Sequence, residues 1–198
     1  MGSWLWRFGG LAGGGVIVRD LSLHVLDLME NSIRAGATVI GVTVVQDRGL
    51  DLLKIVVEDN GPGLGVAPEV ALDPFFTTKG GKRTGLGLSL IRGAAERAGG
   101  TVALERSPLG GLAVVATMKL SHVDRSPMGD LAATISSIVC TNPGIDLRCR
   151  LNVGKGEWEV CSSEVAKELP MAERGGLAIA RRVSERIKAG LASNEVVA

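Results

Sequence analysis

The sequence predicts a two-layer α/β sandwich, in which a mixed sheet carries its helices on one face. Two observations favour this fold class. Over residues 20–120, the patterns follow the order helix, strand, strand, loop, helix, strand, strand, and do not alternate between single strands and single helices. In addition, apolar residues make up 45% of the 198 residues, which is enough to form a sizeable core.

The first predicted helix covers residues 20–35. Its apolar side chains recur at helical spacing, and Gly36 follows where a helix commonly ends. This apolar stripe consists of Leu21, Val25, Leu28, Met29 and Ile33. Two strands joined by a turn are predicted next, at 39–45 and 52–59.

The middle of the chain is predicted to hold a long loop. Residues 61–85 lack periodicity and are rich in Gly, Pro and Thr, with one short helical piece at 67–72. A helix at 87–99 follows. After it, two strands form a hairpin around a turn at 108–111, so the first region ends near residue 120.

The tail, residues 121–198, is interpreted as an α/β extension of unknown role. We expect a helix at 130–139, two short strands at 145–152 and 157–163, and a final helix. The apolar stripe of that helix comprises Leu177, Ala180, Val183, Ile187 and Leu191. The stripe either completes the core or binds a partner, and packing on its own domain is the more common outcome.

Composition narrows the function classes. Lys and Arg number 22 against 21 Asp and Glu, so the net charge of +1 favours neither nucleic acid nor a membrane surface as a partner. Residues 1–19 read as a flexible, Gly-rich lead-in that is too short to span a bilayer. The three cysteines lack C-x-x-C spacing, which predicts buried, inert thiols in the cytoplasm rather than a disulfide framework, with a metal site as the alternative.

The first chemically informative segment is DLMENSIRAGAT, residues 27–38. Asp27 and Asn31 are four residues apart and therefore share a helix face, and Arg34 lies three residues further on the same face, whereas Glu30 points elsewhere. The carbonyl oxygen of Asn31 suits Mg²⁺, and the guanidinium of Arg34 suits phosphate. Scattered polar residues on a surface helix are the alternative interpretation.

The second segment, EDNGPG, follows a predicted buried strand. The carboxylate of Asp59 at the strand end can accept a hydrogen bond from an exocyclic amine such as that of adenine. Gly61 and Gly63 allow a sharp turn and the close approach of a flat ring. A Gly-Pro turn with a capping Asp is the plain alternative.

The third segment, DPFFTTKGGKRTGLGLSL, runs from residue 73 into a helix. Backbone N–H groups of Gly85, Leu86, Gly87 and Leu88 at the helix start suit phosphates. The preceding loop adds hydroxyl and cationic side chains, namely Thr78, Lys79, Lys82, Arg83 and Thr84. The spacing fits neither a Walker A loop nor a Rossmann fingerprint. In this order, the three segments predict an ATP–Mg²⁺ site with adenine near Asp59 and Mg²⁺ at Asn31.

These segments resemble the motifs of the gyrase, heat-shock chaperone, histidine kinase and mismatch-repair ATPase superfamily (GHKL). DLMENSIRAGAT resembles its N box, EDNGPG its G1 box, DPFFTTK its F box and RTGLGLSL its G2 box. The resemblance covers residues 20–120. It implies a Bergerat-type ATP-binding fold with a short ATP lid, and it implies catalytic roles for Asp27, Arg34 and Lys79.

Within the superfamily, the sensor histidine kinases are the most similar branch, because of PFFTTK and because of Arg34, where mismatch-repair ATPases carry an acidic residue. Two positions depart from the family pattern. ATP-hydrolysing branches have Glu where Asp27 stands, and the reach of Asp is shorter by about 1.5 Å, which disfavours activation of water. Many relatives have Thr where Leu112 stands, and Thr117 is a candidate substitute for that polar contact.

A complete histidine kinase carries its phosphoacceptor histidine in a helical hairpin before the N box, and only about twenty residues precede it here. We therefore expect a stand-alone kinase-like domain that acts in trans on a histidine or serine of a protein partner, in two-component signalling. His24 and His122 are expected to be ordinary helix and tail residues rather than acceptors. Two alternatives stay open: a non-catalytic nucleotide-sensing module, and a slow ATPase that forms a homodimer.

Overall fold

The computed structural model of the protein describes residues 20–72, 86–153 and 156–193. Its strands are β1 (Val39–Asp47), β2 (Leu52–Asp59), β3 (Val102–Arg106), β4 (Leu112–Lys119), β5 (Asp146–Val153) and β6 (Gly156–Cys161). Its helices are α1 (Leu21–Arg34), α2 (Pro68–Ala71), α3 (Leu86–Arg97), α4 (Leu131–Thr141), α5 (Ser162–Glu168), the 3-10 turn η1 (Met171–Glu173) and α6 (Gly176–Ser193). The elements predicted before residue 120 are all present within a few residues of their expected ends.

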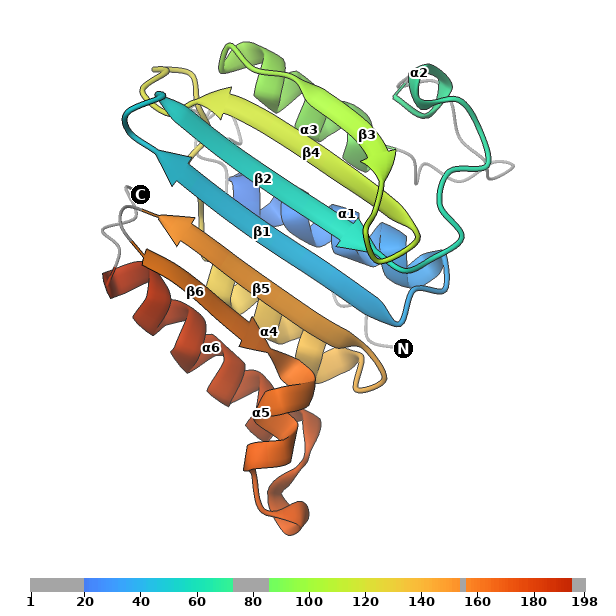
Figure 1. Cartoon of the computed structure of the whole chain (residues 1–198), viewed down its shortest axis with the longest axis vertical. Coiled ribbons are helices and arrows are strands. Elements are labelled where there is room, and N and C mark those ends of the chain that lie inside the picture. Colours follow the sequence, from blue (N-terminus) through green and yellow to red (C-terminus); the bar gives the residue numbers. More distant parts are fainter. Residues whose placement is uncertain (1–19, 73–85, 154–155, 194–198) are drawn as a thin grey trace, which may run out of the picture.

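All six strands form one sheet in the order β3-β4-β2-β1-β5-β6 (Figure 1). β1 lies in the interior of this sheet. It pairs antiparallel with β2, its neighbour in sequence, and parallel with β5, which comes from the tail. The mixed sheet that the sequence predicts is confirmed, and the two tail strands extend it instead of forming a sheet of their own.

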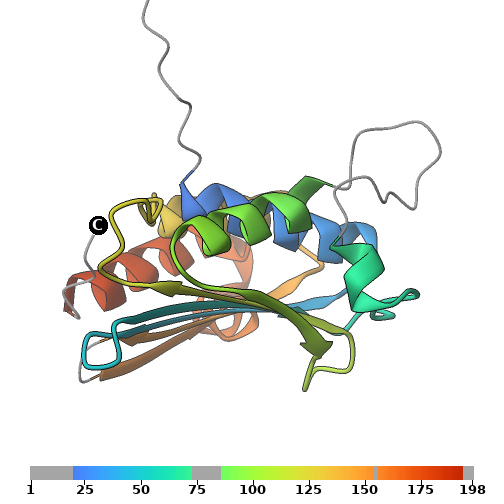
Figure 2. The same ribbon diagram turned by 90° about the horizontal axis from the view of Figure 1, so that it is seen from above.

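The long helices cover one face of the sheet only, which confirms the two-layer sandwich (Figure 2). The side chains along a strand therefore alternate between the helix-covered face and the opposite face. In β2, the side chains of Leu53, Ile55 and Val57 are buried under the helices, and the residues between them face the other side. Helices α1, α4 and α6 complete one continuous core with these strands.

The N-terminus of α1 is held by the segment that follows β4. Asp20 caps the helix by accepting a hydrogen bond from the backbone N–H of Leu23 at 3.0 Å. The N–H groups of the first two helical residues donate to the carbonyl oxygens of Pro127 and Met128 at 2.9 and 2.8 Å. Gly129 has φ +74°, and a Cβ there would lie 2.5 Å from a carboxylate oxygen of Asp20. The tail therefore helps to position the helix that carries the first motif.

The final helix packs on its own domain, as expected, with one exception. Ala180, Val183 and Ile187 are buried and Leu191 is partly buried in the core. Leu177, in the first turn of α6, is 75% exposed and does not join the core with the rest of the stripe. The predicted strand at 157–163 is also shorter than expected, since α5 begins at Ser162.

Within the described ranges, no helix combines the length and the apolar character needed to cross a bilayer.

The three cysteines differ in exposure. Cys149 on β5 is 1% exposed, whereas Cys140 and Cys161 are half-buried, so only Cys149 fits the expectation of a fully buried thiol. Burial raises the pKa of the Cys149 thiol to about 12. No cluster of three or more His, Cys, Asp or Glu side chains suited to a metal ion occurs among the residues that the structure describes.

We predict that iodoacetamide at pH 8 alkylates Cys140 and Cys161 in the folded protein and leaves Cys149 intact, because only the thiolate reacts and Cys149 is both protonated and covered. Peptide mass spectrometry after timed alkylation measures this order. Urea serves as the control, since unfolding should make all three sites react at similar rates. Early modification of Cys149 without urea would show that β5 opens locally.

Candidate functional site

One side of the site is formed by α1 and the start of α3. Asp27 and Asn31 lie on the same face of α1, and Gly87 of α3 packs directly on them. A Cβ at Gly87 would lie 3.2 Å from Nδ2 of Asn31 and 3.3 Å from Cβ of Asp27. The absence of a side chain at Gly87 thus lets the N-terminal turn of α3 approach the polar face of α1. The predicted common face of Asp27 and Asn31 is confirmed.

Arg34 extends this face, as its spacing predicts. Its Nη2 donates to the side-chain oxygen of Asn31 at 2.5 Å, and its Nη1 lies 3.6 Å from a carboxylate oxygen of Glu30. Glu30 therefore pairs with Arg34 along the exposed side of the helix. The guanidinium and the amide oxygen that the sequence predicts for phosphate and Mg²⁺ lie in contact with each other.

The carboxylate of Asp59 lies on the helix-covered face at the end of β2 and is only 5% exposed. Three hydrogen-bond donors hold it. The hydroxyl of Ser32 on α1 donates to Oδ2 at 2.6 Å, and the backbone N–H groups of Gly61 and Leu112 donate to Oδ1 at 2.9 and 3.2 Å. A buried carboxylate needs hydrogen-bond partners, and these three fix its orientation toward α1.

Two tight turns surround this carboxylate. A Cβ at Gly61 would lie 3.1 Å from Oδ1 of Asp59, and Gly63 has φ +75°, a conformation that side chains disfavour. Gly111 in the β3–β4 turn is closer still, because a Cβ there would overlap Oδ1 of Asp59 and lie 2.6 Å from the nitrogen of Gly61. The backbone N–H of Gly111 also donates to the carbonyl of Asp59 at 3.0 Å.

Sequence reasoning missed three residues of this site: Ser32, Asn60 and Gly111. Asn60 ties the G1 segment to the start of β1, since its oxygen accepts from the N–H groups of Thr38 and Val39 at 2.8 and 2.9 Å. Asn60 could have been found, because Asn after a strand and before Gly often bonds to backbone. The roles of Ser32 and Gly111 depend on contacts with Asp59 across the fold.

Part of the predicted site lies outside the described residues, namely Thr78, Lys79, Lys82, Arg83, Thr84 and Gly85. Of the predicted phosphate-binding turn, Leu86 begins α3 and Gly87 is buried against α1. Leu88 packs against the core. The described parts of the N, G1 and G2 segments thus lie next to one another, where α1 contacts both the end of β2 and the start of α3.

A family model described as "Histidine kinase-, DNA gyrase B-, and HSP90-like ATPase" matches residues 17–122, more than half of the chain. The chain belongs to this ATPase family. The match includes α1, the Asp59 turns and α3, and it ends before α4.

Sensor histidine kinases are among the similar proteins. Sensor protein kinase CarS of Pseudomonas aeruginosa is 34% identical over 109 residues, which cover 54% of this chain and 24% of CarS. CpxA of Escherichia coli K12 is 36% identical over 104 residues, which cover 48% of this chain and 21% of CpxA. The crystal structure of the ATP-binding domain of PrrB from Mycobacterium tuberculosis is 31% identical, covers 49% of this chain and 64% of that chain, and has a TM-score of 0.38. The chain therefore spans about a quarter of the length of the curated relatives CarS and CpxA.

In this family member, the departure at Leu112 has a structural explanation. Leu112 lies opposite the end of β2, where its backbone N–H binds Asp59 and its side chain packs against the core. Thr117 does not replace the missing threonine hydroxyl. It lies five residues further along β4, and its hydroxyl is within hydrogen-bond distance of Thr101. The Leu112 side chain therefore places an apolar group, not a hydroxyl, at this end of β2.

We predict that Ser32→Ala lowers the free energy of unfolding by about 1–3 kcal/mol, because the buried Oδ2 of Asp59 loses its 2.6 Å donor. Chemical denaturation with and without ATP measures the effect. Ser137→Ala on α4 is the matched control, since that serine is exposed and its replacement should change the free energy by no more than about 0.5 kcal/mol. Equal stabilities of the two variants would exclude a structural role for the Ser32 hydroxyl.

Proposed function

We propose that this ATPase-family chain is the Mg–ATP-binding catalytic domain of a histidine-kinase-type phosphotransferase, acting on a protein partner. The observation that carries the proposal is the Asp59 carboxylate at the end of β2. Three donors fix it facing the Asn31 helix, and the residues packed closest to it from the two turns, Gly61 and Gly111, have no side chains. This is the geometry that an adenine-binding carboxylate of the family needs.

In the proposed complex, Asp59 accepts a hydrogen bond from the exocyclic amine of adenine through a free lone pair of Oδ2. Hydrogen bonds from Ser32 and the backbone hold the carboxylate and prevent its rotation. Leu112 supplies apolar contact to the ring. Guanine carries an oxygen in place of that amine. This oxygen and Oδ2 of Asp59 are both hydrogen-bond acceptors, so neither would have a donor. The same arrangement therefore favours ATP over GTP.

The phosphate end of the nucleotide is assigned to the polar face of α1. The side-chain oxygen of Asn31 would hold Mg²⁺, which commonly keeps most of its waters and needs only one or two protein oxygens besides phosphate. Bound Mg–ATP supplies the γ-phosphoryl group and the charge neutralisation that its transfer requires. Arg34 already contacts Asn31 and can exchange that contact for phosphate oxygens. Thr78, Lys79 and residues 84–88 are proposed from sequence as further phosphate contacts.

In the transfer step, the acceptor side chain of the partner attacks the γ-phosphorus, and the bond from this phosphorus to the β–γ bridging oxygen breaks with release of ADP. When the acceptor is a serine, its hydroxyl proton has to leave. Asp27 lies on the same α1 face as Asn31, and we assign it the role of receiving that proton. A neutral histidine acceptor needs no such proton transfer when its unprotonated nitrogen attacks.

The positions of the two histidines support transfer to a partner. His24 is a buried residue of α1, with 3% of its surface exposed. His122 follows β4 beside Leu52, at the opposite end of β2 from Asp59, roughly 20 Å along the strand. Because His24 is buried and His122 lies at the far end of β2, we expect neither imidazole to accept the γ-phosphoryl group.

The test is incubation of the purified protein with γ-labelled Mg–ATP and a heat-treated extract of the source organism. We expect the wild type to label a protein of the extract, and Asp59→Asn to label none. Asp124→Asn is the matched control, because that aspartate is exposed and far from the site. Label on the chain itself would contradict transfer to a partner, and phosphate release without label would favour a slow ATPase. ATP that binds but is recovered unchanged would favour a nucleotide-sensing module.

A further inference from the structure

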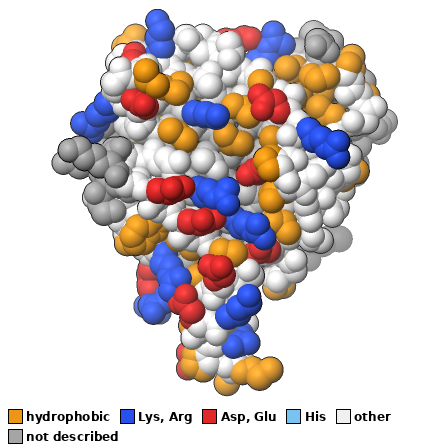
Figure 3. All heavy atoms as spheres, in the orientation of Figure 1, with side chains coloured by type: hydrophobic (Ala, Val, Ile, Leu, Met, Phe, Trp, Pro, Cys, Tyr) orange, Lys and Arg blue, Asp and Glu red, His pale blue; other side chains and the backbone are white. Residues whose placement is uncertain are grey.

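The face of the sheet opposite the helices is left uncovered by the described part of the chain (Figures 1 and 2). Acidic and basic side chains are interleaved over its middle (Figure 3). A shallow pocket in this face is lined by Gly41, Thr43, Glu58, Leu109, Arg148 and Arg150. The pocket lies on the other side of the sheet from Asp59 and has no part in the nucleotide site proposed above.

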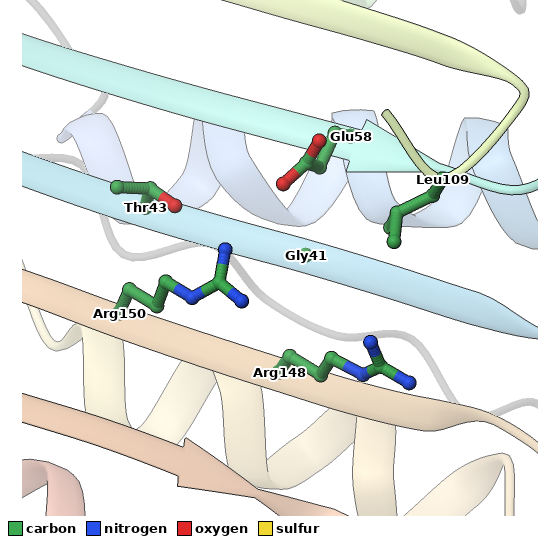
Figure 4. Close-up of a pocket in the computed structure, with 6 residues that line it drawn as sticks. All are labelled: Gly41, Thr43, Glu58, Leu109, Arg148 and Arg150. Atoms are coloured by element: carbon green, nitrogen blue, oxygen red, sulfur yellow. The ribbon is translucent and has the colours of Figure 1, made fainter. Parts of the chain in front are cut away.

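Two arginines of β5 form one wall of this pocket. Arg148 and Arg150 are two residues apart on the strand, so their side chains leave the same face roughly 7 Å apart. Both guanidinium groups point toward β1 and the pocket (Figure 4). They come from a strand with a neighbour on each side, which fixes their spacing.

Each guanidinium keeps N–H groups for a further partner. Arg148 pairs with Asp146 and Arg150 pairs with Glu159, in each case through Nε, at 3.1 and 2.9 Å. Among the described residues, these are the only ion pairs of the two arginines. The terminal nitrogens, which can bind a carboxylate with two parallel hydrogen bonds, point toward the pocket (Figure 4), and within the described part of the chain they donate no hydrogen bond to a carboxylate. Asp146 also raises the pKa of Arg148, which keeps this group charged.

The opposite wall carries a negative charge that does not reach the arginines. Glu58 of β2 leans over Gly41, where a Cβ would lie 2.8 Å from its Cγ, and its carboxylate accepts a hydrogen bond from Ser107 at 3.2 Å. An acid bound in the pocket is therefore attracted to the β5 side and repelled from the β2 side. Thr43, on β1 between the two walls, offers a hydroxyl to the same bound acid.

We propose that this pocket docks an acidic, extended segment of a protein partner, whose alternate Asp or Glu side chains take the terminal N–H groups of Arg148 and Arg150. An extended segment repeats its side chains on one face every two residues, which is the spacing of the two arginines. The proposal goes beyond the nucleotide site and does not depend on ATP turnover.

The experiment uses ¹⁵N-labelled full-length protein and a blocked pentapeptide, Thr-Glu-Thr-Glu-Thr, with Thr-Gln-Thr-Gln-Thr as the control peptide. We expect saturable NMR shift changes at Gly41, Thr43, Arg148 and Arg150 with the glutamate peptide only. Replacement of both arginines by glutamine should weaken binding at least tenfold. Arg181→Gln is the matched control, because that arginine is equally paired with a glutamate but lies on α6, and it should leave binding unchanged.

Glu58→Gln separates this model from general attraction of acids, since it should strengthen binding two- to fivefold and keep the shifts at the same residues. A well-dispersed spectrum verifies that each variant folds. The proposal is overturned if the glutamine peptide shifts the same residues equally, if the double arginine variant binds as well as the wild type, or if the glutamate peptide perturbs α1 and α3 instead.

Discussion

Replacement of Asp59 by Asn is expected to raise the Kd for ATP by about 10- to 150-fold, corresponding to about 1.5–3 kcal/mol for a hydrogen bond to a charged group. Asn has the same shape, and one side-chain oxygen can still accept from the N–H groups of Gly61 and Leu112. Its amide nitrogen then takes the place of Oδ2 and faces both the Ser32 hydroxyl and the adenine amine. The amide nitrogen of Asn and the amine of adenine are both hydrogen-bond donors, so the adenine amine would lose its acceptor.

Calorimetric titration with Mg–ATP and Mg–GTP measures this effect. Asp124→Asn again serves as the control for the loss of one negative charge. The Asn variant should also lose its preference for ATP, because its amide nitrogen can donate to the guanine oxygen. Unchanged ATP affinity, with a folded protein, would place the adenine elsewhere and remove the basis of the proposed function.

Removal of residues 121–198 is expected to abolish cooperative folding, even though the family match ends at residue 122. β1 would lose its whole pairing with β5, from Val39 opposite Asp146 to Gln46 opposite Val153. The first turn of α1 would lose its acceptors at Pro127 and Met128. An interior strand would become an unprotected edge, which favours aggregation. Expression of residues 1–120 should yield insoluble material, or material that elutes as expanded or aggregated species in size-exclusion chromatography and shows no cooperative thermal transition by far-UV circular dichroism.

A point substitution tests the same coupling in the full chain. Leu151→Ala on β5 removes a side chain with no exposed surface, so it should cost about 2–5 kcal/mol. If the tail and the ATP-binding segment are one cooperative unit, the variant shows a single thermal transition at lower temperature, and ATP binding is lost in that same transition. Two separate transitions, with ATP binding retained in the second, would show that residues 20–120 fold on their own.

Local patterns predicted most elements and the position of Asp59 at the end of a strand. These predictions rest on short patterns: the helical stripe of α1, the strand that ends at Asp59 and the glycines after it. Each pattern spans only a few neighbouring residues, so the local sequence is enough to specify it. The common face of Asp27 and Asn31 follows from helix geometry alone.

What could not be predicted depends on contacts between distant segments. Ser32 gains its role only because α1 crosses the sheet at the end of β2, 27 residues away in sequence. The partner of β1 on its second side comes from the tail, and no local pattern specifies a parallel neighbour. Leu112 departs from the family pattern, yet its backbone N–H still donates a hydrogen bond to Asp59. Because this contact comes from the backbone, the identity of the side chain gives no sign of it.

The β1–β5 pairing also has a consequence for synthesis on the ribosome. β2 follows β1 directly, but the partner for the other edge of β1 is translated only after residue 145. At about 5–20 residues per second, Val39 waits roughly 5–20 s for Asp146. During this time the nascent chain has an unpaired strand edge at β1, with apolar side chains such as Val42 and Val44 that are buried in the folded protein. Translational pauses before β5 would therefore reduce the yield of folded protein, whereas pauses after Cys161 would matter much less.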